Sequence, residues 1–135
     1  REQSEKYNNK KLLEYCDLKN LNNLNDFDKE KLKRLTQIDL LWIKDDKVQY
    51  SFEVENSTKF ISGIQRGSNL HKSSPKIMVM PDNRRKEFLN NKDPLFIDQF
   101  KNYNWSYVFY SDIREIVSLK KIKIENLFSK FKKYE

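Results

Sequence analysis

Hydrophobic and polar residues alternate most regularly in the middle of the chain, in two β-favouring runs at residues 37–43 and 48–55. The four residues between them, "KDDK", have the polar, Asp-rich character of a hairpin turn. This pattern predicts an antiparallel hairpin. Because successive side chains of a strand point to opposite faces, Glu53 and Glu55 would share one face of the second strand, and the neighbouring apolar residues would occupy the other.

Helical stripes and short apolar runs alternate through the rest of the chain. Apolar residues at helical spacing predict a helix over residues 56–70, and the stretch "NST" at its start offers three suitable N-caps. Apolar runs at residues 76–80 and 105–110 are typical of buried strands. The remaining segments are one or two short helices within 4–35, a basic helix at 82–91, a Pro-led segment at 94–100, a helix near 112–119, and an amphipathic helix at 124–135 with Ile124, Leu127, Phe128 and Phe131 facing inward.

Two glycines, the only ones in the chain, lie four residues apart within the predicted helix at 56–70. Glycine inside a helix costs about 1 kcal/mol relative to alanine, so Gly63 and Gly67 need a structural reason. Both lie on the apolar stripe of this helix. We therefore expect them to make close backbone contact with the sheet.

The predicted order of elements is α, β, β, α, β, α, β, α. This order is typical of an α/β fold with a mixed β-sheet, in which an antiparallel hairpin is joined by parallel strands and helices flank the sheet. At 135 residues the chain is the size of one domain, so we expect a single domain over residues 1–135. Because the chain begins with Arg1 and not with Met, we expect it to be the C-terminal or catalytic part of a longer protein.

The charge balance narrows the range of partners. Lys and Arg number 27 against 20 Asp and Glu, which gives a formal net charge of +7. Such an excess favours a polyanionic partner such as DNA or RNA, because counterion release from phosphates supplies much of the binding energy. A chain rich in Lys and Asn and without alanine is also what an AT-rich genome produces, so charge alone leaves the partner open.

The cysteine and histidine content excludes two kinds of site. A single cysteine, Cys16, excludes an internal disulfide, and with a single histidine, His71, the chain cannot form a Cys/His zinc site by itself. We interpret His71 as a surface residue and Cys16, Trp42 and Trp105 as core residues.

No apolar stretch approaches the ~20 residues that span a bilayer, and no signal-peptide core is present, so we expect a soluble, cytoplasmic protein without a membrane partner.

Three acids fall on the predicted hairpin. Asp39 lies on the first strand, and Glu53 and Glu55 lie two residues apart on the second, so all three can converge on one hard divalent cation. The carbonyl of Val54 offers a further oxygen. Bound Mg²⁺ or Mn²⁺ would lower the pKa of a water and stabilise charge on a phosphodiester. The alternative is a solvated acidic face balanced by lysines, which a sheet covered by helices disfavours.

The stretch "IDLLWIKDDKVQYSFEVENSTKFISGIQR" resembles the PD-(D/E)xK nuclease superfamily. Asp39 matches the first acid of the motif, Glu53 matches the second, and Glu55 stands where most members have the lysine. Ile38 replaces the proline. Some restriction enzymes of the superfamily use such an E-x-E pair. "KIMVMPDNRRKEFLN" and "DPLF" follow in an order similar to the restriction-endonuclease branch, in which a helix bearing an arginine, here Arg66, follows the E-x-E strand.

The resemblance, which spans about residues 36–109, implies a restriction-endonuclease-like core and a metal-dependent endonuclease that hydrolyses DNA phosphodiester bonds. Asp39 and Glu53 would bind Mg²⁺ or Mn²⁺ together with the carbonyl of Val54. Glu55 would bind a second metal, or position and deprotonate the attacking water in place of the usual lysine.

A nuclease of this kind also needs contacts with the DNA backbone. Arg66 would stabilise charge on the scissile phosphate or orient Glu55, and Gln65 beside it is a weaker candidate for the same role. Many members carry a further Glu on a helix ahead of the hairpin, for which Glu14 is the available counterpart. The other predicted nucleic-acid-binding residues are Lys59, Lys76, Arg84 and Arg85, and for the last two a solvated helix face is the alternative.

Two other functions stay open at this point. The chain could be a catalytically inactive module that keeps the nuclease fold and only binds nucleic acid, or it could be an RNA endonuclease. Cleavage of both strands of DNA requires two active sites, so we expect a homodimer or association with other domains of a larger restriction enzyme.

Overall fold

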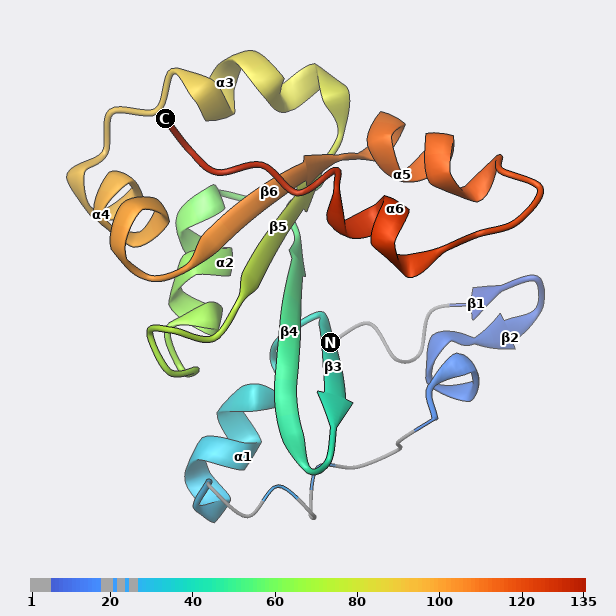
Figure 1. Ribbon diagram of the computed structural model, residues 1–135. Helices are drawn as coiled ribbons and strands as arrows, with labels where there is room; N and C mark the ends of the chain where they lie inside the picture. The colour runs from blue at the N-terminus through green and yellow to red at the C-terminus, as the bar shows by residue number, and fades with distance from the viewer. Residues whose placement is uncertain (1–5, 18–20, 22–23, 25–26) are drawn as a thin grey trace.

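A four-stranded sheet forms the centre of the fold, and its strands lie in the order β3 (Leu40–Lys44), β4 (Lys47–Val54), β5 (Lys76–Met80) and β6 (Trp105–Phe109) (Figure 1). The computed structural model describes residues 6–17, 21, 24 and 27–135. Strands β3 and β4 are antiparallel, whereas β4, β5 and β6 are mutually parallel. The predicted mixed sheet is therefore confirmed.

The hairpin between β3 and β4 turns where the sequence predicts. Asp45 and Asp46 have φ values of 53° and 59°. Both residues therefore adopt the left-handed conformation that a tight two-residue hairpin turn requires and that aspartate tolerates better than most residues. The turn pairs Lys44 with Lys47, and a one-residue register shift between Trp42 and Ile43 then pairs Leu40 with Phe52.

The first strand begins later than predicted, at Leu40 and not at residue 37. The chain first leaves helix α1 (Lys29–Leu35) through a tight turn, in which the N–H of Gln37 bonds to the carbonyl of Arg34 and the N–H of Ile38 to that of Leu35. These two N–H groups are therefore not available for hydrogen bonds between strands. The pattern of the side chains gave no sign of this turn.

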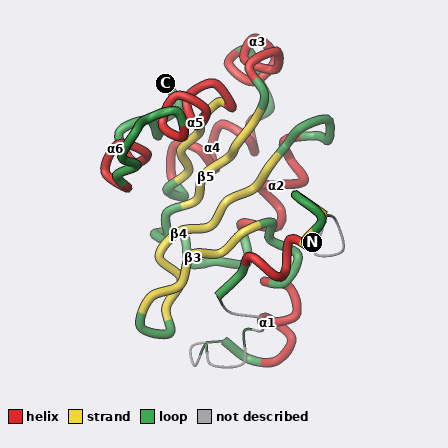
Figure 2. The backbone as a smooth tube through the Cα atoms, turned by 90° about the vertical axis from the view of Figure 1, so that its right-hand side faces the viewer, coloured by secondary structure: helices red, strands yellow, loops and turns green. Residues whose placement is uncertain are grey.

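Helices cover both faces of the sheet (Figure 2). Helices α2 (Phe60–Gly67), α3 (Arg85–Leu89) and α4 (Pro94–Asn102) pack on one face, and α5 (Tyr110–Val117) and α6 (Ile124–Phe128) pack on the other. Side chains of β5 alternate between the two cores: Met78 and Met80 contact the aromatic rings of α2, α3 and α4, whereas Ile77 and Val79 face α5 and the chain after α6. The flanking helices predicted from the sequence are thus present.

The N-terminal part of the chain differs from the predicted helices. It contains two short antiparallel strands, β1 (Lys6–Tyr7) and β2 (Lys10–Lys11), followed by a 3₁₀ turn, η1 (Leu12–Tyr15). Left-handed conformations at the two asparagines between the strands make the hairpin turn, which the weak apolar periodicity could not indicate. Glu14 is exposed on η1. The rest of the predicted helical region before residue 27 lies largely outside the described residues.

Three further helix predictions need correction at their ends. The N-cap of α2 is Lys59, without a side-chain cap, and not a residue of "NST". The basic segment begins as a 3₁₀ turn, η2 (Asp82–Arg84), before α3. Helix α6 is only five residues long, because the chain beyond it extends and pairs Lys132 with Tyr107 on β6. Its first residue, Ile124, is exposed and does not face inward.

The two tryptophans have different environments. Trp105 is fully buried, as predicted, but the side chain of Trp42 is 37% exposed. Because β3 is an edge strand, the ring of Trp42 is covered only by neighbours such as Tyr50 and Phe128. Cys16 is half-buried and not a full core residue. Within the described part of the chain, no helix is long and apolar enough to cross a membrane.

Both glycines of α2 lie against the sheet, as expected. A Cβ atom at Gly67 would lie 2.5 Å from the ring of Trp105, and one at Gly63 would lie 2.7 Å from Glu55. Any larger residue at these two positions would push α2 away from the sheet.

We expect Gly67→Ala to destabilise the protein by about 1–3 kcal/mol, because overpacking against Trp105 outweighs the gain in helix propensity. Chemical denaturation measures the change, and Gln65→Ala, an exposed position of the same helix, serves as the control with an effect within about 0.5 kcal/mol. A Gly67→Ala protein more stable than the wild type would contradict the close packing described here.

Candidate acidic site

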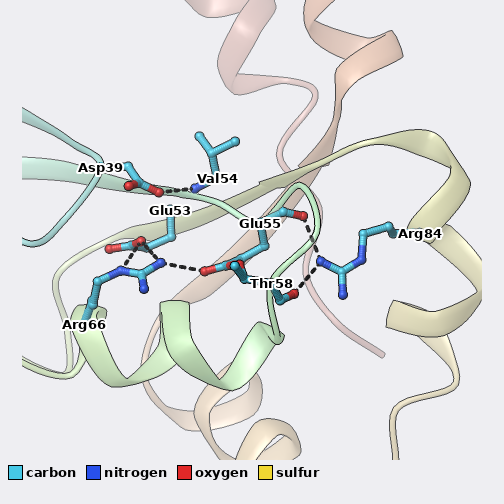
Figure 3. Close-up of polar contacts among 7 residues, drawn as sticks. All are labelled: Asp39, Glu53, Val54, Glu55, Thr58, Arg66 and Arg84. Carbon is cyan, nitrogen blue, oxygen red and sulfur yellow. Dashed lines mark hydrogen bonds and ion pairs between the residues drawn. The ribbon is translucent and has the colours of Figure 1, made fainter. Parts of the chain in front are cut away.

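The three predicted acids meet at the end of β4 (Figure 3). Glu53 and Glu55 are both fully buried and point towards α2. Asp39 directly precedes β3, and the register that pairs Leu40 with Phe52 brings it opposite Glu53. Its Oδ2 accepts a hydrogen bond of 2.8 Å from the N–H of Val54. The antiparallel hairpin thus delivers Asp39 beside the glutamates, although Asp39 itself lies outside the strand.

Arg66 from α2 lies between the two glutamates. Its Nε donates to Glu53 Oε2 at 2.8 Å, and its Nη2 lies 2.7 Å from the same oxygen. The same Nη2 also donates to Glu55 Oε1 at 2.6 Å. A single guanidinium therefore compensates two carboxylates that burial would otherwise make very unfavourable.

The close approach of α2 depends on Gly63. A Cβ atom at this position would lie 2.7 Å from Glu55 Oε1 and 3.3 Å from the Cβ of Glu53. Only glycine leaves room for both acids beneath the helix. Sequence reasoning expected a close contact here but did not connect Gly63 with the acids.

The electrostatics of Glu53 are unusual for a glutamate. Burial, with a smaller effect from the neighbouring charge of Asp39, raises the pKa of Glu53 to about 8 against the opposing effect of Arg66. The Oε1 atom of Glu53 is buried and accepts no hydrogen bond within the described residues. A bound proton or a cation would satisfy this buried oxygen.

The loop after β4 holds Glu55 from its other side. The hydroxyl of Thr58 donates a hydrogen bond to Glu55 Oε2. Arg84 Nη1 donates to the carbonyl oxygens of Glu55 and Thr58, at 3.0 and 2.7 Å, and its guanidinium lies 3.9 Å from the centre of the Phe60 ring. The side chain of Arg84 is only 12% exposed. In the structure this arginine fixes the loop that carries Glu55, and its predicted DNA contact stays a prediction.

Lys76 also has a different role from the one predicted. It is buried, and its Nζ donates to the carbonyl oxygens of His71, Ser74 and Tyr103 at 2.9 Å and contacts that of Lys72 at 3.5 Å. Burial lowers the pKa of Lys76 to about 8. An ammonium group enclosed by carbonyl oxygens cannot reach a phosphate, so Lys76 stabilises the turn before β5. His71 is exposed, as predicted.

The other predicted contacts remain accessible. Lys59 and Gln65 are exposed at the start and on the outer side of α2. Arg85 is 47% exposed, lies 3.8 Å from Asp82 and has its guanidinium over the ring of Phe109. These three side chains can meet a ligand without rearrangement of the core.

Of the side chains gathered here, Asp39 and Glu53 are the pair best suited to a cation. No group of three or more acidic, His or Cys side chains in the described ranges is arranged to bind a metal ion. Between Glu53 and Glu55 lies the guanidinium of Arg66. Two carboxylates are nevertheless enough for Mg²⁺, which usually keeps several waters. The unpartnered Oε1 of Glu53 beside Asp39 fits such an ion.

Thr58, Gly63 and the positioning role of Arg84 were missed by sequence reasoning. Thr58 was considered only as a helix cap, and its contact with Glu55 depends on the shape of the loop. The sequence did contain a sign that Gly63 lies beside the acids. It lies eight residues after Glu55, and Arg66 follows one turn later on the same face of α2.

A family model described as "Type II restriction enzyme NmeDI C-terminal domain" matches residues 1–132. No curated protein and no solved structure matches the chain.

The raised pKa of Glu53 has a consequence for stability. Between the unfolded pKa of about 4.5 and the folded pKa of about 8, the folded protein retains a proton that the unfolded chain has lost. Without divalent cations, the free energy of unfolding should therefore fall as pH rises through this window, by roughly 1.4 kcal/mol for each pH unit. Glu53→Gln should remove this slope, and Glu115→Gln, at an exposed position, should keep it. Denaturation from pH 5 to pH 8 with a chelator tests this, and equal slopes for wild type and Glu53→Gln would contradict it.

Proposed function

The chain belongs to the family of type II restriction enzyme NmeDI C-terminal domains, and on this premise we propose that it is a catalytic part of a restriction enzyme, which hydrolyses DNA phosphodiester bonds with the aid of a divalent cation. The observation that carries the proposal is the burial of Glu53 and Glu55 under Arg66. Buried carboxylates lower stability unless they are fully compensated, so a domain that only bound DNA would gain nothing from them.

The proposed cation is Mg²⁺ or Mn²⁺, held by Asp39 and Glu53 with the carbonyl of Val54. Such an ion lowers the pKa of a bound water and stabilises the charge that develops on a phosphodiester. Glu55 stands where the PD-(D/E)xK pattern has a lysine, and we assign it the acceptance of a proton from the attacking water. Thr58 and the loop fixed by Arg84 hold the carboxylate of Glu55 in place for this step.

Arg66 has two roles in this proposal. Before substrate binds, it is the countercharge of Glu53 and Glu55. Its guanidinium is partly exposed and lies beside the acids, so it is also suited to stabilise charge on the scissile phosphate. Lys59 and Arg85 remain as exposed contacts for the DNA backbone.

A second candidate function is a nuclease-like module that binds DNA without cutting it. One observation favours it: Arg66 already lies between Glu53 and Glu55, and no group of three ligands is assembled among the described residues. In this case the site would be only a structural element. Cleavage assays separate the two functions.

The direct test is nicking of supercoiled plasmid in the presence of Mg²⁺ or Mn²⁺. We expect the wild type to nick the plasmid, and Glu53→Ala and Glu55→Gln to reduce the rate at least ~100-fold, since each removes a group that binds the cation or transfers the proton. Glu30→Ala, an exposed acid of α1, is the matched control and should cut at the wild-type rate. Circular dichroism checks that each variant is folded. Cleavage by Glu53→Ala at the wild-type rate would refute the assignment.

A second test uses the countercharge role of Arg66. Without divalent cations, Arg66→Met should destabilise the protein by about 3–5 kcal/mol, because the buried side chains of Glu53 and Glu55 lose their shared hydrogen-bond partner and Glu55 loses its countercharge. Millimolar Ca²⁺ should then raise the melting temperature of Arg66→Met more than that of the wild type, since a cation replaces the lost charge. Arg34→Met, at an exposed position of α1, controls for loss of positive charge. An equal effect of Ca²⁺ on wild type and Arg66→Met would exclude a cation at this site.

A further inference from the structure

The segment between α5 and α6 is the most exposed apolar stretch of the described chain. Residues 117–125 are exposed without interruption. They include four large apolar side chains, of which Val117 and Ile122 are the most accessible at 63% and 61%, followed by Leu119 and Ile124. Soluble proteins rarely cluster exposed apolar residues in this way unless the surface binds something. We refer to residues 117–124 as the α5–α6 segment.

The same segment is strongly basic. Lys120, Lys121 and Lys123 alternate with its apolar residues, and it contains no acid. None of these three lysines forms an ion pair with a residue that the structure describes. Their positive charge is therefore available to a partner.

We propose that the α5–α6 segment binds duplex DNA, with its lysines on the phosphates and Ile122 against the sugars and bases of a groove. The identity of this partner rests on the proposed function, but the surface itself lies outside the acidic site. Lysines beside protruding aliphatic side chains are typical of elements that enter the minor groove.

A protein partner fits this surface less well. The cores of protein–protein interfaces are depleted of lysine, and burying three ammonium groups without acids opposite them would be unfavourable. Interfaces with DNA are by contrast much more positively charged and polar than those between proteins. Charge complementarity therefore selects the polyanion.

The segment is anchored to the strands that carry the acids. Just after it, Phe128 of α6 stacks on Tyr50 of β4 at 5.0 Å and contacts Trp42 of β3 at 5.8 Å between ring centres. An ion pair of 2.9 Å joins Glu115 of α5 to Lys130 in the turn just after α6. Figure 1 shows the segment extending outward from α5 and returning to α6, whereas α1 lies at the other end of the hairpin. The β3–β4 hairpin that anchors this segment on one face of the sheet thus also positions Asp39 and Glu53, which lie towards α2 on the opposite face.

The test is the affinity for a labelled DNA duplex, measured by fluorescence anisotropy in EDTA so that no cleavage occurs. The triple variant Lys120→Ala, Lys121→Ala, Lys123→Ala should bind at least 10-fold more weakly at ~0.1 M salt, and its slope of log K against log salt should fall by about 2–3. The matched control is Lys29→Ala, Lys31→Ala, Lys33→Ala on α1, which removes the same charge from exposed positions. It should keep both the affinity, within about 3-fold, and the slope.

Ile122→Ser separates the apolar contribution from the charge. We expect it to weaken binding several-fold while leaving the salt slope unchanged, and because the residue is exposed, the melting temperature should not change. Equal losses in both triple variants would overturn the inference, and so would a wild type that binds anionic vesicles but no DNA through this segment. Failure of the proposed function is distinguishable, because it would appear as absence of cleavage with Mg²⁺ while this binding result in EDTA still stands.

Discussion

The contact of Arg66 with Glu53 and Glu55 is the interaction on which the arrangement of the site depends. Two carboxylates buried at the end of a strand are tolerated only because a guanidinium donates to both, at 2.6–2.8 Å. That contact requires α2 to lie directly on β4, and only a glycine at position 63 permits it. The acidic site, the packing of α2 on β4 and the glycine at position 63 therefore depend on one another.

This arrangement links stability with chemistry. Burial holds the pKa of Glu53 near 8 and leaves one of its oxygens without a partner beside Asp39. A site that would be more stable if it were apolar is a typical mark of function. The membership of the chain in a restriction-enzyme family gives that function a context, and the basic, apolar α5–α6 segment supplies a second surface suited to the same polyanion.

Sequence patterns predicted the sheet and the grouping of the acids, but not which atoms the ends of long side chains contact. Period-two alternation was enough for the β3–β4 hairpin, and two glycines in a helical stripe were enough for the contact of α2 with the sheet. Lys76 and Arg84 were assigned to DNA, yet each is engaged by backbone carbonyl oxygens. Those oxygens come from residues up to 29 positions away, so only the folded chain brings them together. Near the N-terminus, weak periodicity and turn-forming asparagines concealed a β-hairpin.

The proposed function depends on a divalent cation shared by Asp39 and Glu53. A crystal soaked in Mn²⁺ and measured near the manganese absorption edge tests it most directly. We expect an anomalous peak at about 2.1–2.2 Å from a carboxylate oxygen of each residue, the distance expected for a small hard cation with oxygen ligands. Anomalous density absent from this pair at saturating Mn²⁺, with Arg66 still bound to both glutamates, would contradict it.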